Sequence, residues 1–273
     1  MKRFVRIAVA ATLVAAGILA ARATVRSIAV RREMTEGQQA LDRRDFRLAA
    51  ARFRSALDRD PRSTAVRLSL AAAYAGGYVP GGESPGNLAL ARQAFDEYRR
   101  ILERDPGNRM AVRGTAALYD GDGNYDEART WYRRAVALDP ADADALASLS
   151  TTASRQVAEA VLDARARAGL APDDRGPIAD TSLAAELRTR WSATIDDGIA
   201  DATRALSLDP AHDGALAAMS AWHRLKADVA GSIDAWQQET RAADDWMRKA
   251  LAARKVESDR ARTLHAASSE AVR

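Results

Sequence analysis

The stretch "GNYDEARTWYRRAVALDP", residues 123 to 140, decides how the rest of the chain is interpreted. After its opening glycine, Ala128, Tyr132 and Ala135 recur at intervals of four and three residues, which places them on one face of a helix. The residue before Pro140 is disfavoured in the helical conformation, so the helix is expected to end there. The stretch therefore predicts a turn followed by a single helix with a small-residue face.

The acids around this turn raise a second interpretation, a calcium-binding loop, because Asp120, Asp122 and Asn124 alternate along the chain. A calcium-binding helix–loop–helix motif needs glycine at its sixth position and glutamate at its twelfth. Counted from Asp120, those positions hold Tyr125 and Trp131. We therefore interpret the segment as a turn whose carboxylates stand at the positive end of a helix dipole.

Four Asp-Pro pairs mark a repeat along the chain, and their prolines are Pro61, Pro106, Pro140 and Pro210. Successive prolines lie 45, 34 and 70 residues apart. Thirty-four residues is the length of a known helix–turn–helix repeat unit. The longer spacings are expected to hold insertions, one of which is the Gly-rich segment 76–86.

Residues 109–142 resemble one unit of the tetratricopeptide repeat family. Thr115-Ala116 replaces the Leu-Gly pair of the family pattern, and the positions that match it in phase are Tyr119, Ala128, Tyr132, Ala135 and Pro140. The resemblance implies an all-α fold, an α-solenoid of antiparallel helix pairs that wind into a right-handed superhelix. Composition agrees, because Ala and Leu dominate the apolar residues and favour helices.

The resemblance implies one repeat domain, residues 30–253, between an N-terminal segment 1–29 and a tail 254–273 that is expected to be flexible. Its units are expected at about residues 30–63, 64–108 with the loop insertion 76–86, 109–142, 143–212 with an insertion, and 213–253. Stretches such as "YVPGGESPGN" also resemble a group of bacterial repeat proteins without an assigned activity.

The first residues follow the order of a secretory signal peptide: the basic start "MKRFVR", fifteen apolar or small residues, and an A-x-A site at 21–23. Arg22 at the centre of that site is unfavourable for cleavage. An uncleaved membrane anchor of residues about 5–25 is therefore the alternative, although a span needs roughly twenty apolar residues. Either case predicts export to the bacterial cell envelope, periplasmic after cleavage or anchored in the inner membrane.

The basic excess of the chain is confined to this N-terminal segment. The formal charge is +4, but seven Lys and Arg residues precede the first acid, Glu33. Without those seven, 34 basic residues face 37 acidic ones. A nucleic-acid-binding protein carries its basic excess on the folded body, so a nucleic-acid partner is not expected.

No motif for catalysis, cofactor binding or metal binding is found, so no enzyme, cofactor or metal site is expected. The chain has no cysteine, and its three histidines form no H-E-x-x-H motif. His223 is expected to pack between helices. The adjacent acids Asp173-Asp174, Asp196-Asp197 and Asp244-Asp245 are interpreted as solvated residues, because neighbours on a helix point in different directions.

The resemblance also implies where a partner binds. In this family the second, fifth, ninth and twelfth positions of each unit line the concave groove. Here they are Met34, Gln38, Leu41, Leu68, Ala72, Met110, Arg113, Ala117, Asp120, Asp144 and Thr151. Members that clamp a chaperone's terminal carboxylate carry Lys and Asn where Met34 and Gln38 stand, so that mode is not expected. Small and apolar groove positions favour a peptide or helix as the partner.

The sequence thus predicts a non-enzymatic scaffold or adaptor for an unidentified protein or peptide. The alternative is a structural subunit of an envelope assembly, and a homo-oligomer remains open. An apolar outer face on the last helix pair would favour assembly. Four tryptophans after residue 190 are expected to fill the core, with a contact surface as the alternative: Trp191, Trp222, Trp236 and Trp246.

Overall fold

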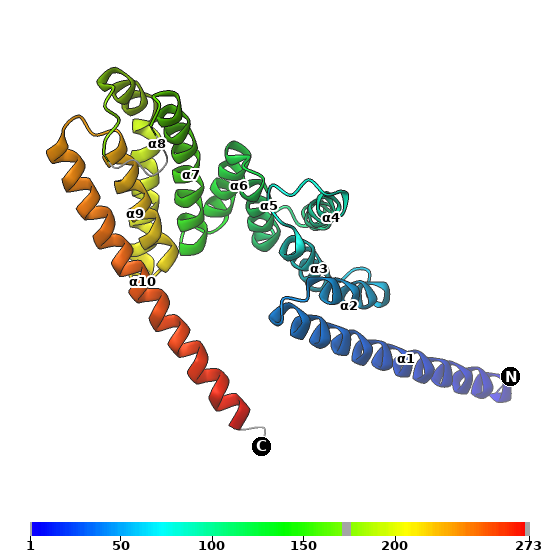
Figure 1. Ribbon diagram of the computed structural model, residues 1–273. Coiled ribbons are helices and arrows are strands. Elements are labelled where there is room, and N and C mark those ends of the chain that lie inside the picture. Colours follow the sequence, from blue (N-terminus) through cyan, green and yellow to red (C-terminus); the bar gives the residue numbers. More distant parts are fainter. Residues whose placement is uncertain (1, 171–175, 271–273) are drawn as a thin grey trace. The chain divides into compact units, whose positions relative to one another are not determined.

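The computed structural model describes the backbone of residues 2–170 and 176–270, and the side chains of most residues from 20 to 263. Within these ranges the chain forms ten helices and no strand, which confirms the predicted all-α fold (Figure 1). It divides into two compact units, Met1–Gly114 (unit 1) and Thr115–Arg273 (unit 2). No signal in the sequence marks this boundary, which falls inside the fifth helix.

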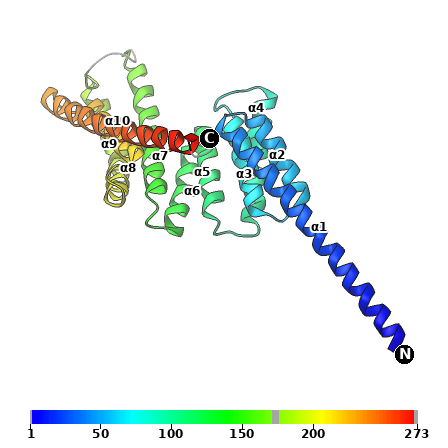
Figure 2. The same cartoon turned by 90° about the horizontal axis from the view of Figure 1, so that it is seen from below.

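Unit 1 contains two helix pairs and the start of a third. Its helices are α1 (Lys2–Asp42), α2 (Phe46–Arg59), α3 (Thr64–Gly77), α4 (Pro85–Leu102) and the first part of α5 (Arg109–Gly121). Helix α1 packs on α2, α2 on α3, and α3 on α4 (Figure 2). Unit 2 continues with α6 (Tyr125–Leu138), α7 (Ala143–Arg167), α8 (Thr181–Leu208), α9 (Asp213–Asp228) and α10 (Ile233–Glu270).

Short polar side chains start most of these helices. For example, the Asp45 carboxylate accepts a hydrogen bond from the Leu48 amide at 3.0 Å, which satisfies one of the free N–H groups of the first turn. The other caps are Ser63, Ser84, Asn124, Asp142, Asp180 and His212. At the opposite ends, the Asp of three Asp-Pro pairs follows the last helical turn: Asp60, Asp139 and Asp209.

Helices α1 and α2 approach closely because one of them presents a glycine. Phe53 of α2 is fully buried, and its ring lies against the backbone of Gly37 in α1. A Cβ atom at Gly37 would come within 2.5 Å of the Phe53 ring, closer than carbon atoms pack. The small residues Ala40, Ala49 and Ala56 complete this interface.

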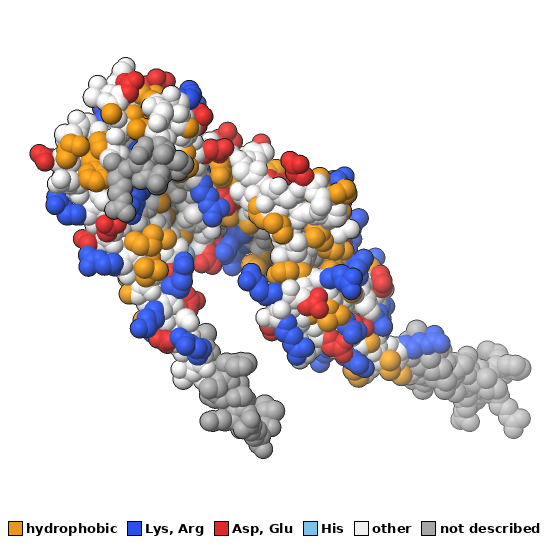
Figure 3. Space-filling view, viewed as in Figure 1, with side chains coloured by type: hydrophobic (Ala, Val, Ile, Leu, Met, Phe, Trp, Pro, Cys, Tyr) orange, Lys and Arg blue, Asp and Glu red, His pale blue; other side chains and the backbone are white. Residues whose placement is uncertain are grey.

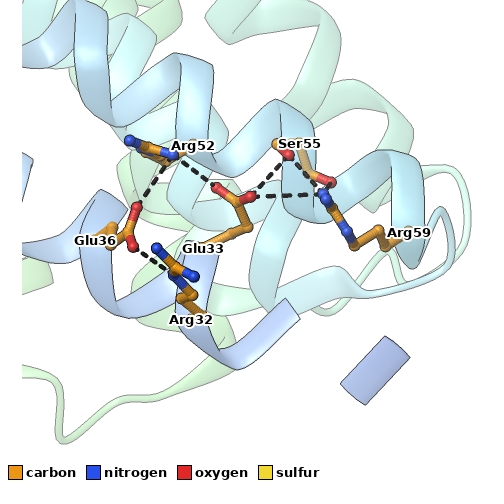
Figure 4. A network of polar contacts seen from close by, with 6 residues as sticks. All are labelled: Arg32, Glu33, Glu36, Arg52, Ser55 and Arg59. Atoms are coloured by element: carbon orange, nitrogen blue, oxygen red, sulfur yellow. Dashed lines mark hydrogen bonds and ion pairs between the residues drawn. The ribbon is translucent and has the colours of Figure 1, made fainter. Parts of the chain in front are cut away.

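A network of charged and polar side chains covers the edge of the same helix pair (Figure 4). Glu33 of α1 accepts a hydrogen bond from Ser55 of α2 at 3.1 Å, and Glu36 pairs with Arg52 at 3.1 Å. A further hydrogen bond, from Arg32, holds the pKa of Glu36 below its ordinary value. The network therefore ties α1 to α2 beyond their apolar contact.

Helices α3 and α4 share a buried ion pair. Arg67 of α3 donates to the Glu97 carboxylate of α4, and both side chains are about 10% exposed. Arg67 also donates to the Pro61 carbonyl at 3.1 Å, and Arg100 donates to the second oxygen of Glu97 at 2.5 Å. These hydrogen bonds are needed because an ion pair taken out of water is stable only when its remaining polar atoms are satisfied.

The Gly-rich connection between α3 and α4 is shorter than the insertion 76–86 predicted from the sequence. Helix α3 extends to Gly77 and α4 starts at Pro85, which leaves 78–84 as the loop. Proline is favoured in a first helical turn because it has no N–H to satisfy. The Asn87 amide holds the loop through hydrogen bonds to the carbonyls of Val79 and Gly82, both at 2.7 Å.

The core of unit 2 lies between α7, α8 and α9. It contains Val157 and Val161 from α7, Ile195 from α8, and Trp222 and Leu225 from α9, all of them buried. The indole N–H of Trp222 donates to the Ser150 hydroxyl at 2.9 Å, and that hydroxyl donates to the Gly198 carbonyl at 2.6 Å. This buried chain of hydrogen bonds connects all three helices.

The end of α9 holds the segment that joins α7 to α8. Arg165 donates to the Gly176 carbonyl at 3.1 Å and to the Asp228 carboxylate at 3.3 Å. The amide of Ile178 donates to the Asp228 carbonyl at 2.9 Å. Because the Asp228 carboxylate is largely buried, its pKa is raised above the ordinary value, although Arg165 opposes this shift. The predicted acid pair Asp173-Asp174 lies outside the described residues.

Helix α10 is longer than the sequence suggests. It packs along α9, and Arg254 pairs with Asp213 at the start of α9 at 3.0 Å. The sequence predicts a flexible tail from Arg254, whereas the structure continues the helix to Glu270. The side chains described beyond Arg254 are exposed, in keeping with the loss of apolar periodicity there.

Helix α1 runs without a break through Val30, where the sequence predicts the repeat domain to start. Most of the apolar run of the predicted signal or anchor, residues 2–16, 18 and 19, lies outside the residues whose side chains are described. Among the residues searched, which are the described ones, no helix combines the length and apolarity needed to cross a membrane.

Replacing Gly37 with alanine is expected to lower the free energy of unfolding by about 1–3 kcal/mol, because the added methyl group meets the Phe53 ring. The matched control is Gly86→Ala in α4, where a Cβ atom meets nothing within 4 Å. That control should be neutral or stabilising by up to about 1 kcal/mol. Urea denaturation followed by circular dichroism measures both, and equal effects would contradict the close approach.

Replacing Arg67 with methionine is expected to cost about 3–5 kcal/mol, because the buried Glu97 carboxylate loses a charged partner. Arg99→Met, which removes an exposed ion pair with Asp96, should cost less than about 1 kcal/mol. Both changes lie in unit 1, so the same urea titration compares them directly. A loss for Arg67→Met no larger than for Arg99→Met would show that the buried pair is not important for stability.

Candidate partner-binding site

All eleven predicted groove residues lie on the first helices of their pairs, α1, α3, α5 and α7, and none of them is buried. Seven of these residues belong to unit 1 and four belong to unit 2. Unit 1 holds Met34, Gln38, Leu41, Leu68, Ala72, Met110 and Arg113, and unit 2 holds Ala117, Asp120, Asp144 and Thr151. Each set is therefore described within its own unit.

In unit 1, α1 and α3 contact one another and present the accessible positions on neighbouring helices. Met34, Gln38 and Leu41 follow the helical spacing of four and three residues, so they share one face of α1. Gln38 is exposed, while Met34 and Leu41 are half-buried. Leu68, half-buried, and Ala72, exposed, lie one turn apart on α3.

None of these five side chains is charged. The Gln38 amide donates a hydrogen bond to the Asp42 carboxylate at 3.0 Å, at the exposed end of α1. Met110 of α5, also in unit 1, is 63% exposed and is a flexible apolar side chain of the kind that adapts to different partners. Such a surface suits apolar side chains of a peptide or helix better than an anionic group.

The predicted groove residues of unit 2 are different, because their carboxylates have intramolecular partners. Asp120 of α5 pairs with Arg155 of α7 at 2.5 Å, and the other oxygen of Asp120 is buried without a hydrogen-bond partner. Asp144 of α7 accepts from the ring Nε2 of His212 at 3.0 Å. These contacts tie Asp120 and Asp144 to their neighbours.

Sequence reasoning missed both partners of these acids. Arg155 lies one helical turn after the predicted groove residue Thr151, and that spacing is the only signal in the sequence. His212 follows Pro210, and besides its contact with Asp144 its Nδ1 accepts a hydrogen bond from the Ala215 amide at 3.2 Å and so caps α9. With Nδ1 accepting, the proton of the neutral ring is on Nε2, where it donates to Asp144.

The segment that resembles a calcium loop is a turn between α5 and α6. Gly123 takes a left-handed conformation with φ of +72°, which other residues rarely adopt. The Asn124 side chain accepts a hydrogen bond from the Glu127 amide as the cap of α6, and Asp126 accepts from Gln156 at 2.8 Å. Among the residues described, no three His, Asp or Glu side chains are grouped as metal ligands.

The remaining candidates are tied to helix packing. His223 lies between α9 and α10, with its Nδ1 2.6 Å from the Glu239 carboxylate, and Asp244 pairs with Arg224 at 3.0 Å. Of the four C-terminal tryptophans, Trp222 is fully buried in the core. The other three, Trp191, Trp236 and Trp246, are half-buried.

The charged side chains of both signs are interspersed on the face shown in Figure 3. Apolar side chains lie among them in small groups rather than in one continuous sheet.

Successive antiparallel helix pairs with a small-residue interface define an α-helical repeat protein. A family model described as "Tetratricopeptide repeat" matches residues 34–101, and a second, described as "TPR repeat", matches residues 121–149. The chain therefore contains tetratricopeptide repeats in these two segments. Comparison with curated proteins gives no match.

Solved structures of other repeat proteins resemble the chain at low sequence identity. MamA from Desulfovibrio magneticus RS-1 is 15% identical with a TM-score of 0.48, and the match covers 84% of this chain and 96% of that chain. TTC0263, a thermophilic TPR protein from Thermus thermophilus, is 16% identical with a TM-score of 0.39, covering 70% and 98%. PilF of Pseudomonas aeruginosa is 16% identical with a TM-score of 0.39, covering 86% and 99%.

Calcium is expected to leave the melting temperature unchanged, whether it is added or removed with EDTA, because Asp120 pairs with Arg155, Asn124 caps α6 and Asp126 accepts from Gln156. Asp120→Asn should lower the melting temperature equally with and without calcium, since it weakens the contact with Arg155. Differential scanning calorimetry measures both effects. A stabilisation by calcium that disappears in Asp120→Asn would contradict the assignment as a turn.

Proposed function

We propose that the protein is a non-enzymatic scaffold that binds a peptide or helix of a partner protein along the first helices of its repeats. The observation that carries the proposal is the surface of α1 and α3, where five accessible side chains stand on two adjacent helices. Buried residues lie between them, such as Gly37 and Ala40 on α1 and Leu70 and Ala71 on α3. The core thus holds the surface in place.

The chemistry of this surface indicates the kind of partner. Met34, Leu41 and Leu68 offer partly buried apolar contact, and Gln38 offers an amide that both donates and accepts hydrogen bonds. Ala72 leaves room between them. A partner helix with apolar residues at intervals of three and four would place them against such a surface.

The cell envelope is the proposed location, supported by the basic, apolar and small-residue order of residues 1–23. Two N-termini are compatible with it. Cleavage after Ala23 would give a periplasmic protein that starts at Thr24, and an uncleaved segment would give one anchored in the inner membrane. Intact-mass determination on the purified protein distinguishes them.

A second candidate function, a structural subunit of an envelope assembly, is favoured by the last helix. Helix α10 exposes apolar side chains that would be buried if another repeat or another copy of the chain packed there: Ile233 at 58%, Met247 at 39%, Leu251 at 56% and Val256 at 51% exposed. End repeats of soluble solenoids usually carry a polar outer face.

A photo-crosslinking amino acid placed at Ala72 tests the two candidates, with the exposed positions Leu251 on α10 and Arg47 on α2 as comparisons. Binding through α1 and α3 predicts an adduct with one heterologous polypeptide at Ala72, none at Arg47, and loss of that adduct when Leu68 is replaced by glutamate. Adducts between copies of the chain at Leu251, with none at Ala72, would overturn the scaffold proposal in favour of assembly.

A further inference from the structure

A cavity of about 290 Å³ lies within unit 2, lined by residues of α6, α7 and α8. Figure 1 shows these three helices. Helix α7 forms its apolar floor, because α7 packs against both α6 and α8. Two arginines of α6, two aspartates of α8 and two apolar residues of α7 line it: Arg129, Arg133, Asp197, Asp201, Leu149 and Ala153.

The charged residues form two rows of opposite sign. Arg129 and Arg133 are four residues apart on α6, and Asp197 and Asp201 are four residues apart on α8, so each pair shares one helical face. Three arginines act to lower the pKa of Asp201: Arg204 of α8 first, then Arg133 and Arg129 of α6. Burial outweighs them and raises that pKa above its ordinary value.

The two rows do not neutralise one another by direct contact. In the described part of the chain, the ion pairs within 4.0 Å include none between these arginines and these aspartates. Arg129 donates from its Nη1 to the Gln156 side chain at 2.8 Å, but its Nε is buried with no hydrogen-bond partner. Burial also lowers the pKa of the Arg129 guanidinium. Arg129 and Asp201 are half-buried, whereas Arg133 and Asp197 are exposed at the mouth. The cavity therefore presents charges of both signs, one of each partly desolvated.

We propose that this cavity binds a small zwitterion, an α-amino acid with a short apolar side chain. Its ammonium group would lie at Asp197 and Asp201, and its carboxylate would accept hydrogen bonds from Arg129 and Arg133. The side chain would pack against the α7 floor. A zwitterion carries the two charges that the two rows require, at opposite ends of one small molecule.

Other small ligands fit the cavity less well. A simple anion would face the two aspartates, and a simple cation would face the two arginines, so each would meet repulsion together with attraction. The volume lies just below the range of roughly 300–1,000 Å³ that is usual for ligand pockets. This size favours a molecule with few atoms over a peptide segment.

The inference goes beyond the proposed scaffold function and is independent of it. The cavity belongs to unit 2, whereas the surface tested by crosslinking at Ala72 belongs to unit 1. A failure of one proposal therefore leaves the other unaffected, and the two experiments report separately.

Isothermal titration calorimetry with L-valine, N-acetyl-L-valine and L-valinamide tests the proposal on the unaltered protein. L-Valine should give saturable binding. Each blocked analogue lacks one of the two charges and should bind at least about tenfold more weakly, because a charge-assisted hydrogen bond is lost. L-Alanine and L-leucine in the same titration show whether the floor limits side-chain size.

Substitutions in the cavity give a second, matched measurement. Asp201→Asn and Arg133→Gln should each weaken L-valine binding at least about tenfold, whereas Asp196→Asn, an exposed neighbour outside the lining, should leave it unchanged. Circular dichroism checks that the variants fold. No saturable heat with any of the three amino acids at millimolar concentration would overturn the proposal. Equal binding of L-valine and L-valinamide would also overturn it.

Discussion

The structure depends on how closely two helices can approach when one of them presents a glycine to an aromatic ring. The ring of Phe53 lies against Gly37 where α2 packs on α1. In the same way, the ring of Tyr98 in α4 lies against Gly114 in α5, and the ring of Trp222 in α9 lies against Gly198 in α8. In each case an added Cβ atom would overlap the ring. Because aromatic residues make up only 5% of the chain, these few rings supply much of the large-volume packing, and alanines fill the rest. The packing of Tyr98 also affects its hydroxyl group, because burial raises the pKa of Tyr98 to about 12.

This packing explains why the accessible surface is so regular. The first helix of a pair packs its glycine and alanine residues against the second helix. Its opposite face is accessible, and the side chains on that face recur at the helical spacing of three and four residues. The candidate surface of α1 and α3 is therefore a direct result of the small-residue interface behind it. The buried ion pair of Arg67 with Glu97 adds a polar contact between α3 and α4 to this packing.

Much of the fold follows from local signals in the sequence. The Asp-Pro pairs, Gly123 and the small residues at 128 and 135 act within one or two helical turns, and they are sufficient to predict helix pairs and their approximate ends. The same is not true of the site. Packing brings together helices whose residues lie tens of positions apart in the sequence. It places Asp120 beside Arg155, and it places Asp197 and Asp201 around the same cavity as Arg129 and Arg133. The adjacent acids Asp196-Asp197 are exposed, as the sequence indicates, and only the position of α6 shows that Asp197 also lines a cavity.

The length of α10 has a consequence for how the chain responds to its surroundings. Up to Arg254 the helix packs along α9, so its conformation is coupled to the core of unit 2. The sixteen residues from Lys255 to Glu270 extend past that contact, and the side chains described there are exposed. An isolated helix of about this length is only marginally stable in water. Its helix content is therefore set by a local helix–coil equilibrium, which shifts gradually with temperature and salt while the packed repeats unfold in a cooperative transition.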